Sequence, residues 1–259
     1  MSTRVGIAGV GAIGSAVARA LQDGIPGFTL EAVSDPSPIE PFDVPHVSFE
    51  SLAERCDLIV EALPPAIVPA LAQEVFKHHK PLILISSSAL LLFPGILDHQ
   101  QASDSRIIVP SGALCGIDGV NALVQIGIKH AKISTTKPPH GYGNAPYVEE
   151  QSIDLSSITE RRCLFQGNAL EAAAGFPANV NVAATLSLAG IGPEKTQVEI
   201  WADPDVITNR HDIEVVGEFS TIRTCVENTP DPANPKSSML TAQSIVAVLK
   251  GMNAPLVVL

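Results

Sequence analysis

The stretch Val5-Gly-Ile-Ala-Gly-Val-Gly-Ala-Ile-Gly14 decides the fold of the N-terminal half of this chain. An apolar run typical of a buried strand leads directly into a G-x-G-x-x-G pattern formed by Gly9, Gly11 and Gly14. The residues from Ala12 to Leu21 then have helical spacing and helix-forming composition. A glycine-rich turn between a strand and a helix is the context in which this pattern binds a dinucleotide.

Each glycine of this turn has its own predicted role. Gly9 permits the tight turn, Gly11 lets the backbone approach a pyrophosphate, and Gly14 lets the helix pack close to the strand. The positive end of the helix dipole favours the anionic phosphates. We therefore expect cofactor contacts at Gly9, Gly11, Ala12, Ile13 and Gly14.

Asp35 ends the second apolar run, about 20 residues beyond the turn, where a carboxylate accepts hydrogen bonds from the adenosine ribose. A carboxylate here would repel a ribose 2′-phosphate, and the sequence Pro36-Ser-Pro38 supplies no cation to neutralise one. We therefore predict NAD as the cofactor in preference to NADP. The alternative is a glycine turn that binds no ligand. The position of the glycine pattern, directly before a helix and upstream of Asp35, argues against this alternative.

Short apolar runs alternate with amphipathic stretches throughout this half of the chain. The runs occupy residues 5–10, 30–34, 58–63, 82–85 and 107–109. They are apolar at most positions rather than at every second position, which is typical of parallel strands covered by helices on both faces. This pattern predicts a Rossmann-type, doubly wound α/β domain over residues 1–110.

After Pro110 the composition changes, and we predict an α/β substrate and oligomerisation domain over residues 111–234. Strands are expected at residues 131–137, 197–202 and 213–226, in a mostly antiparallel sheet. Residues 138–146 are dense in turn formers, which predicts a loop and a candidate lid. A final helix is expected at residues 237–249.

The overall composition excludes several classes of function. A net charge of −11 with 16 Lys and Arg argues against nucleic-acid binding, which requires clustered cations. The chain has no secretory signal pattern and no apolar run long enough for a membrane span, so we expect a cytoplasmic protein without a membrane partner. The four widely spaced cysteines are expected to be reduced and mostly buried, and no metal site is predicted.

The candidate for proton transfer is His211, which lies where a loop leads into a predicted strand of the second domain. His140, in the candidate lid, is the second choice. The serines at residues 86–88 and at 111 lack a nucleophile-elbow pattern and are expected to be turn and strand-end residues.

Several strings together resemble the L-aspartate dehydrogenase family, and they occur in family order along nearly the whole chain. They are Gly9 to Gly14, Ser111-Gly-Ala-Leu-Cys-Gly-Ile-Asp118, Ser134-Thr-Thr-Lys-Pro-Pro139, Phe176-Pro-Ala-Asn-Val-Asn-Val-Ala-Ala184, Ala202-Asp-Pro204, Asn209-Arg-His211 and Asn234-Pro-Lys-Ser-Ser238. The resemblance implies an NAD-dependent amino-acid dehydrogenase in which His211 is the catalytic residue. It also implies that the C-terminal segment, residues 235–259, completes the Rossmann domain. It also implies cofactor contacts at Ala113 and Asn181, and a role in NAD biosynthesis or aspartate catabolism.

The implied reaction defines what the substrate site must supply. Aspartate loses a hydride and a proton and leaves an imine that water converts to the oxo acid, so a histidine of ordinary pKa suits the proton transfer. The two substrate carboxylates require cations, hydroxyls or a helix N-terminus. The predicted substrate-binding residues are Thr135, Thr136, Lys137, Asn209, Lys236, Ser237 and Ser238, the last three at the expected start of the final helix. A homodimer or homotetramer is also expected.

Two alternatives remain open at this point. The chain departs from the family pattern at Cys115 and Ser220, which allows a related dehydrogenase or reductase that acts on a different amino acid or imine. A non-catalytic NAD-binding regulator would keep the glycine turn and Asp35 but would not need His211, and the Asn-x-His setting of His211 argues against it.

Overall fold

The computed structural model describes residues 2–231 and 234–258, and for residues 230, 231 and 234–237 it describes the backbone alone. The chain divides into two compact units, one formed by Met1–Gly112 with Met239–Leu259 and the other by Ala113–Ser238. The chain re-enters the first unit at Met239, four residues after the predicted residue 235, because residues 234–238 form a strand.

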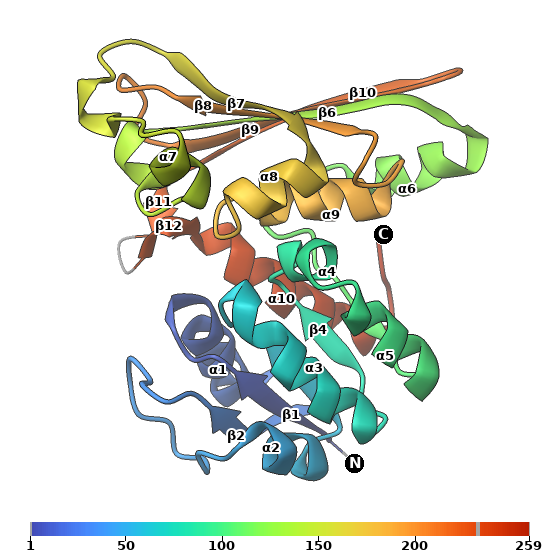
Figure 1. Ribbon diagram of the computed structural model, residues 1–259. Coiled ribbons are helices and arrows are strands. Elements are labelled where there is room, and N and C mark those ends of the chain that lie inside the picture. The colour runs from blue at the N-terminus through green and yellow to red at the C-terminus, as the bar shows by residue number, and fades with distance from the viewer. Residues whose placement is uncertain (1, 232–233, 259) are drawn as a thin grey trace. The chain divides into compact units, whose positions relative to one another are not determined.

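The first unit is built on a parallel five-stranded sheet in the order β2-β1-β3-β4-β5. Its strands are β1 (Thr3–Ala8), β2 (Phe28–Ser34), β3 (Leu58–Glu61), β4 (Leu82–Leu84) and β5 (Ile107–Ile108). Its helices are α1 (Ala12–Gly24), α2 (Phe49–Arg55), η1 (Pro65–Ile67), α3 (Val68–Lys77), α4 (Ser88–Leu92), α5 (Gly95–Ser103) and α10 (Met239–Met252). Helices cover both faces of the sheet, which confirms the predicted Rossmann-type architecture (Figure 1).

The two faces of this sheet contribute to separate apolar cores. Val5 and Ile7 belong to a core shared with α1 and α10, to which α10 contributes Ile245. Ala8 and Ile59 belong to a second core shared with α2 and α3. Because successive strand residues point to opposite faces and both faces are covered, most positions of these strands are apolar. This explains why the sequence shows largely apolar runs rather than alternation.

The order of the strands creates a topological switch point between β1 and β3. From β1 the chain moves outward to β2 and then returns to β3 on the other side of β1. In open α/β sheets, ligands bind at the carboxyl ends of the strands at such a point. Gly9 follows β1, Asp35 follows β2 and Glu61 ends β3, so all three residues lie at this edge of the sheet.

The second unit contains a mixed five-stranded sheet in the order β10-β9-β6-β8-β7, in which only β6 and β8 run parallel among the described strands. Its strands are β6 (Ile128–Lys137), β7 (Arg162–Asn168), β8 (Thr196–Ala202), β9 (Asn209–Gly217) and β10 (Thr221–Asn228), with β11 (Pro230–Asp231) and β12 (Asn234–Ser238) as a separate pair. Its helices are α6 (Ile117–Ile126), η2 (Pro139–Tyr142), α7 (Pro146–Glu150), η3 (Leu155–Ser157), α8 (Ala169–Gly175) and α9 (Asn181–Ala189). Helices α8 and α9 cover one face of the five-stranded sheet (Figure 1).

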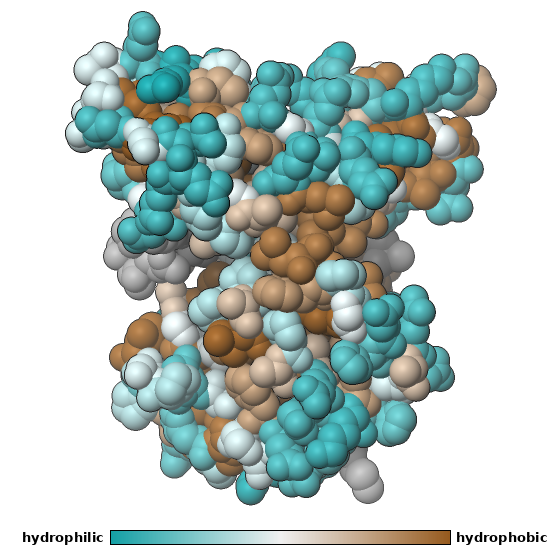
Figure 2. Space-filling model, viewed as in Figure 1, coloured by the Kyte–Doolittle hydropathy of each residue, from teal (hydrophilic) through white to brown (hydrophobic). Residues whose placement is uncertain are grey.

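The other face of this sheet carries charged side chains. Lys132 forms an ion pair with Glu199 at 2.7 Å, and Arg210 forms one with Asp212 at 2.7 Å. The surface around this sheet is mainly hydrophilic in Figure 2. Strand β9 therefore alternates between buried residues that face the helices and more accessible residues, among them the charged Arg210, Asp212 and Glu214.

Residues 138–146 form helical turns rather than the predicted irregular loop. Pro139 opens the short helix η2 and Pro146 opens α7, because a proline is well tolerated where the helical N–H has no partner. Tyr142 is fully buried, and its hydroxyl donates a hydrogen bond to the Trp201 carbonyl at 3.0 Å. The prediction of an irregular loop was therefore wrong, because Tyr142 holds this segment against the sheet.

Two smaller predictions also require correction. Residues 213–226 belong to two strands, β9 and β10, which pair as a hairpin around residues 218–220. Of the four free cysteines, Cys56 is buried, whereas Cys115, Cys163 and Cys225 are exposed, so the expectation of mostly buried thiols was wrong. None of the helices in the described ranges is long and apolar enough to cross a membrane.

Candidate active site

The three glycines of the turn in the first unit differ in the space around them: a side chain would clash at Gly9 and Gly14 but not at Gly11. Gly9 has a φ of +87°, and a Cβ at this position would clash with the Ala62 carbonyl oxygen. A Cβ on Gly14 would overlap the Gly9 carbonyl oxygen, so only glycine allows α1 to approach β1 this closely. A Cβ added at Gly11 meets nothing within 4 Å. The open side of the turn is therefore at Gly11.

Helix α1 begins at this open side with Gly11 as its N-cap, and no side chain of the described residues caps it there. The N–H groups at the start of a helix have no partner within the helix, so those near Ala12 and Ile13 can donate to an anion. The dipole of a 13-residue helix adds a favourable field for negative charge. The turn thus fits the pyrophosphate of a dinucleotide, as its sequence predicts.

Asp35 is held in place by the backbone beside this turn. Its Oδ2 accepts a hydrogen bond from the Val10 N–H at 2.8 Å, and its Oδ1 accepts one from the Ser37 N–H at 2.8 Å. Asp35 also lines a pocket of about 490 Å³ together with Pro36 and His46. This arrangement fits the adenosine half of a dinucleotide beside the predicted ribose anchor.

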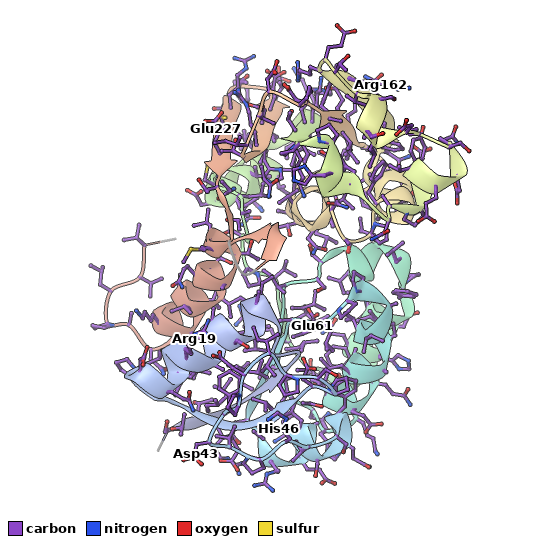
Figure 3. The ribbon with its side chains drawn as sticks, turned by 90° about the vertical axis from the view of Figure 1, so that its left-hand side faces the viewer. Arg19, Asp43, His46, Glu61, Arg162 and Glu227 are labelled. Carbon is purple, nitrogen blue, oxygen red and sulfur yellow. The ribbon has the colours of Figure 1, made fainter. Side chains whose placement is uncertain are left out.

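His46, labelled in Figure 3, reaches this pocket from the loop that follows β2. The loop returns to β2 through a backbone pairing of His46 with Val33. The sequence analysis did not place His46 near the predicted cofactor site. The backbone pairing that brings this loop back to β2 does not depend on a recognisable pattern of residue types.

Glu61 is a fully buried carboxylate that the sequence analysis did not single out (Figure 3). Its Oε1 accepts a hydrogen bond from the Leu63 N–H at 2.6 Å, and its Oε2 accepts from the N–H groups of Ile85 at 3.1 Å and Ser86 at 3.0 Å. Burial raises the pKa of Glu61 to about 7, although these hydrogen bonds act in the opposite direction. The available signal was a glutamate that ends an otherwise apolar strand, where a charge without partners would be strongly unfavourable.

In the second unit, Thr135 and His211 face each other across neighbouring strands. The register pairs Thr135 of β6 with His211 of β9, and a hydrogen bond of 3.0 Å joins Thr135 Oγ1 to His211 Nδ1. Both residues are buried, and so are Lys137 and Asn209, which lie two positions along the same strands. Because side chains alternate along a strand, these four predicted residues share one face of the sheet.

Lys137 supplies a buried positive charge on this face. Its side chain is 5% exposed, and its Nζ donates a hydrogen bond to Asn179 Oδ1 at 3.1 Å. A lysine is rarely buried to this extent without polar partners. Asn179 lies just before α9, and the sequence analysis missed its role although it lies within the quoted string from Phe176 to Ala184.

The surroundings of His211 keep its imidazole uncharged. Burial, together with the positive charge of Lys137, lowers the pKa of His211 to about 3, and the nearby Asp212 offsets only part of this shift. An uncharged imidazole at neutral pH has a nitrogen that can accept a proton. The cluster therefore combines a proton acceptor with a fixed cation in one buried place.

Thr136 and His140 do not join this cluster. Thr136 is buried but points to the opposite face of the sheet, the face of its register partners Trp201 and Arg210. His140 is exposed on η2, because Tyr142 rather than His140 anchors that segment to the sheet.

The remaining predicted residues lie near the ends of elements of the second unit. Ala113 is buried at the start of this unit, and Asn181 is the first residue of α9. Ser238 is buried, and its hydroxyl donates to Asn228 Oδ1 at 2.9 Å. The side chains of Lys236 and Ser237 lie outside the described residues, and their backbone belongs to β12 rather than to the start of the final helix.

Comparison with known proteins identifies the family. Residues 118–252 match the family model described as aspartate dehydrogenase, C-terminal, and residues 9–110 match the model described as homoserine dehydrogenase, NAD binding domain. The chain therefore has the domain that binds a nicotinamide cofactor, in agreement with the geometry of its glycine turn.

Individual relatives extend this similarity over the whole chain. The chain is 43% identical to L-aspartate dehydrogenase 3 of Bordetella bronchiseptica, over 97% of this chain and 95% of that protein. It is 42% identical to an L-aspartate dehydrogenase of Bradyrhizobium diazoefficiens, over 98% and 93% of the two chains. The crystal structure of aspartate dehydrogenase from Thermotoga maritima superposes with a TM-score of 0.77 and 26% identity, and each chain is covered completely. These matches confirm the resemblance seen in the sequence: the chain belongs to the L-aspartate dehydrogenase family.

Proposed function

We propose that the protein catalyses the NAD-dependent oxidative deamination of L-aspartate to oxaloacetate and ammonia. The observation that carries this proposal is the buried cluster of Thr135, Lys137, Asn179 and His211 in a chain of this family. The first unit would hold the cofactor through its glycine turn and Asp35. When bound, the nicotinamide supplies the acceptor for the hydride that leaves the substrate Cα.

Lys137 is the proposed partner of a substrate carboxylate. A buried ammonium group forms strong hydrogen bonds with a carboxylate, and Asn179 fixes the direction in which the Lys137 side chain extends. Asn209, on the same face, and Ser238 add polar groups in this unit. A substrate with two carboxylates could contact both the ammonium group of Lys137 and these polar groups. This favours a dicarboxylic amino acid over an aliphatic one.

His211 is the proposed proton acceptor for the substrate amine and for the water that attacks the imine. In the proposed tautomer, Nδ1–H donates to Thr135 Oγ1, which leaves Nε2 as the proton acceptor. A substrate carboxylate beside Lys137 would offset the positive charge that lowers the His211 pKa. Substrate binding would thus raise the pKa of His211 and make it a stronger base for the proton transfer.

The uncharged state of His211 can be tested by titration. We expect the ring nitrogen signals of His211 to show no protonation between about pH 8 and pH 5, whereas an exposed histidine titrates near 6.5. In Lys137→Met the pKa of His211 should rise, because one of the two causes of its depression is removed. NMR spectra of labelled protein, assigned by difference from His211→Asn, measure both values. A midpoint near 6.5 in the wild type would contradict the buried, uncharged state.

Asp35 should determine the choice between the two nicotinamide cofactors. We expect the wild type to prefer NAD, and Asp35→Asn to reduce the ratio of kcat/KM for NAD over NADP by roughly tenfold or more, because the repulsion of a 2′-phosphate is removed. Asparagine keeps an acceptor oxygen for the hydrogen bond from Val10 or Ser37. Kinetics with both cofactors measure the ratio. An unchanged ratio would show that Asp35 does not face the ribose hydroxyls.

The reverse reaction tests the proposed chemistry directly. With oxaloacetate, ammonium and NADH, we expect NADH consumption and the formation of L-aspartate, measured by absorbance and by chromatography. Omission of ammonium should abolish consumption, because the imine cannot form. NADH consumption by oxaloacetate alone would instead indicate reduction of the ketone and would contradict the proposal.

A further inference from the structure

We propose that Glu61 is a positioning residue for the nicotinamide half of the cofactor, which it serves by holding the loops after β3 and β4 together. The proposal rests on the family's nicotinamide cofactor and not on the identity of the amino-acid substrate. Glu61 is fully buried and lies at the carboxyl edge of the sheet, where the cofactor is expected.

The order of the strands assigns each half of the cofactor to a side of the switch point. Asp35 after β2 marks the adenosine side, and the glycine turn after β1 marks the pyrophosphate. The remaining half must therefore extend to the other side, over β3 and β4. The loops that follow these two strands begin at Ala62 and Ile85.

The carboxylate of Glu61 links these two loops by using one oxygen for each. Its Oε1 accepts from Leu63 in the loop after β3, whereas its Oε2 accepts from Ile85 and Ser86 in the loop after β4. A second link runs in parallel, because the Ser86 hydroxyl donates to the Leu63 carbonyl at 2.6 Å. The relative position of the two loops thus depends on Glu61 and Ser86 together.

The same loop also packs against the glycine turn. The Ala62 N–H donates to the Ala8 carbonyl at 2.8 Å, and the Ala62 carbonyl occupies the space into which a side chain at Gly9 would extend. The residue after Glu61 therefore contacts the turn that holds the pyrophosphate. Glu61 therefore directly precedes a residue that packs against the glycine turn.

Backbone donors face both carboxylate oxygens of Glu61, an arrangement that suits an ionised carboxylate. Glutamine has the same shape, but its NH₂ group would face the donors of one of the two loops. Burial of a carboxylate is unfavourable, and an apolar side chain of similar size would serve a purely structural core as well or better. A carboxylate suits this position because it can accept hydrogen bonds from both loops and so hold the loops after β3 and β4 in a fixed relative position.

The test is to compare how Glu61→Gln binds NADH and ADP, since ADP carries only the adenosine and pyrophosphate part of the cofactor. We expect the Kd for NADH to rise roughly tenfold, the equivalent of one lost charged hydrogen bond, and the Kd for ADP to change by less than about twofold. Isothermal titration calorimetry on the full-length protein measures both. Equal weakening of both ligands, or of neither, would overturn the proposal.

Two further variants make the comparison specific. Asp57→Asn removes a carboxylate just before the opposite end of β3, where Asp57 pairs with Arg4, and should leave both dissociation constants unchanged. Ser86→Ala removes the second link between the loops and should weaken NADH selectively, by a smaller factor than Glu61→Gln. If Glu61→Gln does not fold, Ser86→Ala alone decides the matter, and equal effects on both ligands would overturn the proposal. Because the readout is binding, a lack of turnover with aspartate would contradict the proposed reaction without affecting this result.

Discussion

Replacement of His211 by alanine is expected to lower kcat by roughly 10²- to 10⁴-fold, the usual range for loss of a general acid or base. The imidazole is buried against Thr135 and close enough to Lys137 for its charge to lower the His211 pKa. Alanine would leave no group at this position to accept the substrate proton. The Kd for NADH should change by less than about twofold, because the glycine turn belongs to the other unit. Steady-state kinetics and an NADH titration measure the two quantities.

His140→Ala is the matched control for this experiment. His140 is exposed on η2, and substitutions at such surface positions have small effects, so kcat should stay within about twofold of the wild type. A His211→Ala variant with a wild-type kcat would remove His211 from the proposed mechanism. A large loss of activity in His140→Ala would show that η2 contributes a catalytic group after all.

Replacement of Lys137 by methionine is expected to raise KM for L-aspartate by roughly 30- to 1000-fold. Truncation of one partner of a buried, hydrogen-bonded charge pair weakens binding by about 2 to 4 kcal/mol, which corresponds to this range. Methionine keeps most of the apolar stem of Lys137, so the packing around the side chain is largely preserved. Initial rates over a wide range of aspartate concentrations measure the effect.

Lys132→Met tests whether this effect depends on position. Lys132 lies on the same strand, β6, but it is paired with Glu199 on the outward face of the sheet. Its replacement should leave KM within about twofold of the wild-type value, as is usual for a partly exposed ion pair. Equal effects of the two substitutions would indicate a general loss of positive charge rather than a specific carboxylate contact.

The first unit was largely predictable because its sequence pattern is local and redundant. Five largely apolar runs identify the strands without knowledge of their partners. The turn from Gly9 to Gly14 adds conformational requirements that only glycine satisfies at Gly9 and Gly14. Glu61 could not be assigned in this way, because its three backbone partners come from two loops that only the folded sheet brings together.

The second unit was harder to predict because long-range packing decides its local structure. Residues 138–146 contain turn formers, yet the burial of Tyr142 and its bond to Trp201 order them into short helices. The start of the final helix was also misplaced, because residues 234–238 pair with β11 before the helix begins at Met239. Composition alone does not contain either of these contacts.

The functional residues of the second unit could be predicted as candidates but not as a cluster. The string from Ser134 to Lys137 contains two threonines, and only the strand register distinguishes Thr135, which faces His211, from Thr136 on the opposite face. Asn179 could not be connected to Lys137 from the sequence, since 42 positions separate the two residues along the chain.

The most direct test of the central claim is a comparison of kcat/KM for oxidation of L-aspartate, L-glutamate, L-asparagine and L-alanine by the purified protein with NAD. NADH formation is followed by absorbance, and NADP serves as the second cofactor. The proposed site predicts that L-aspartate with NAD is preferred by roughly tenfold or more, because loss of one well-placed carboxylate contact weakens binding at least that much. Preference for a different amino acid, or no turnover of aspartate by a protein that binds NADH, would contradict the assignment of L-aspartate as the substrate.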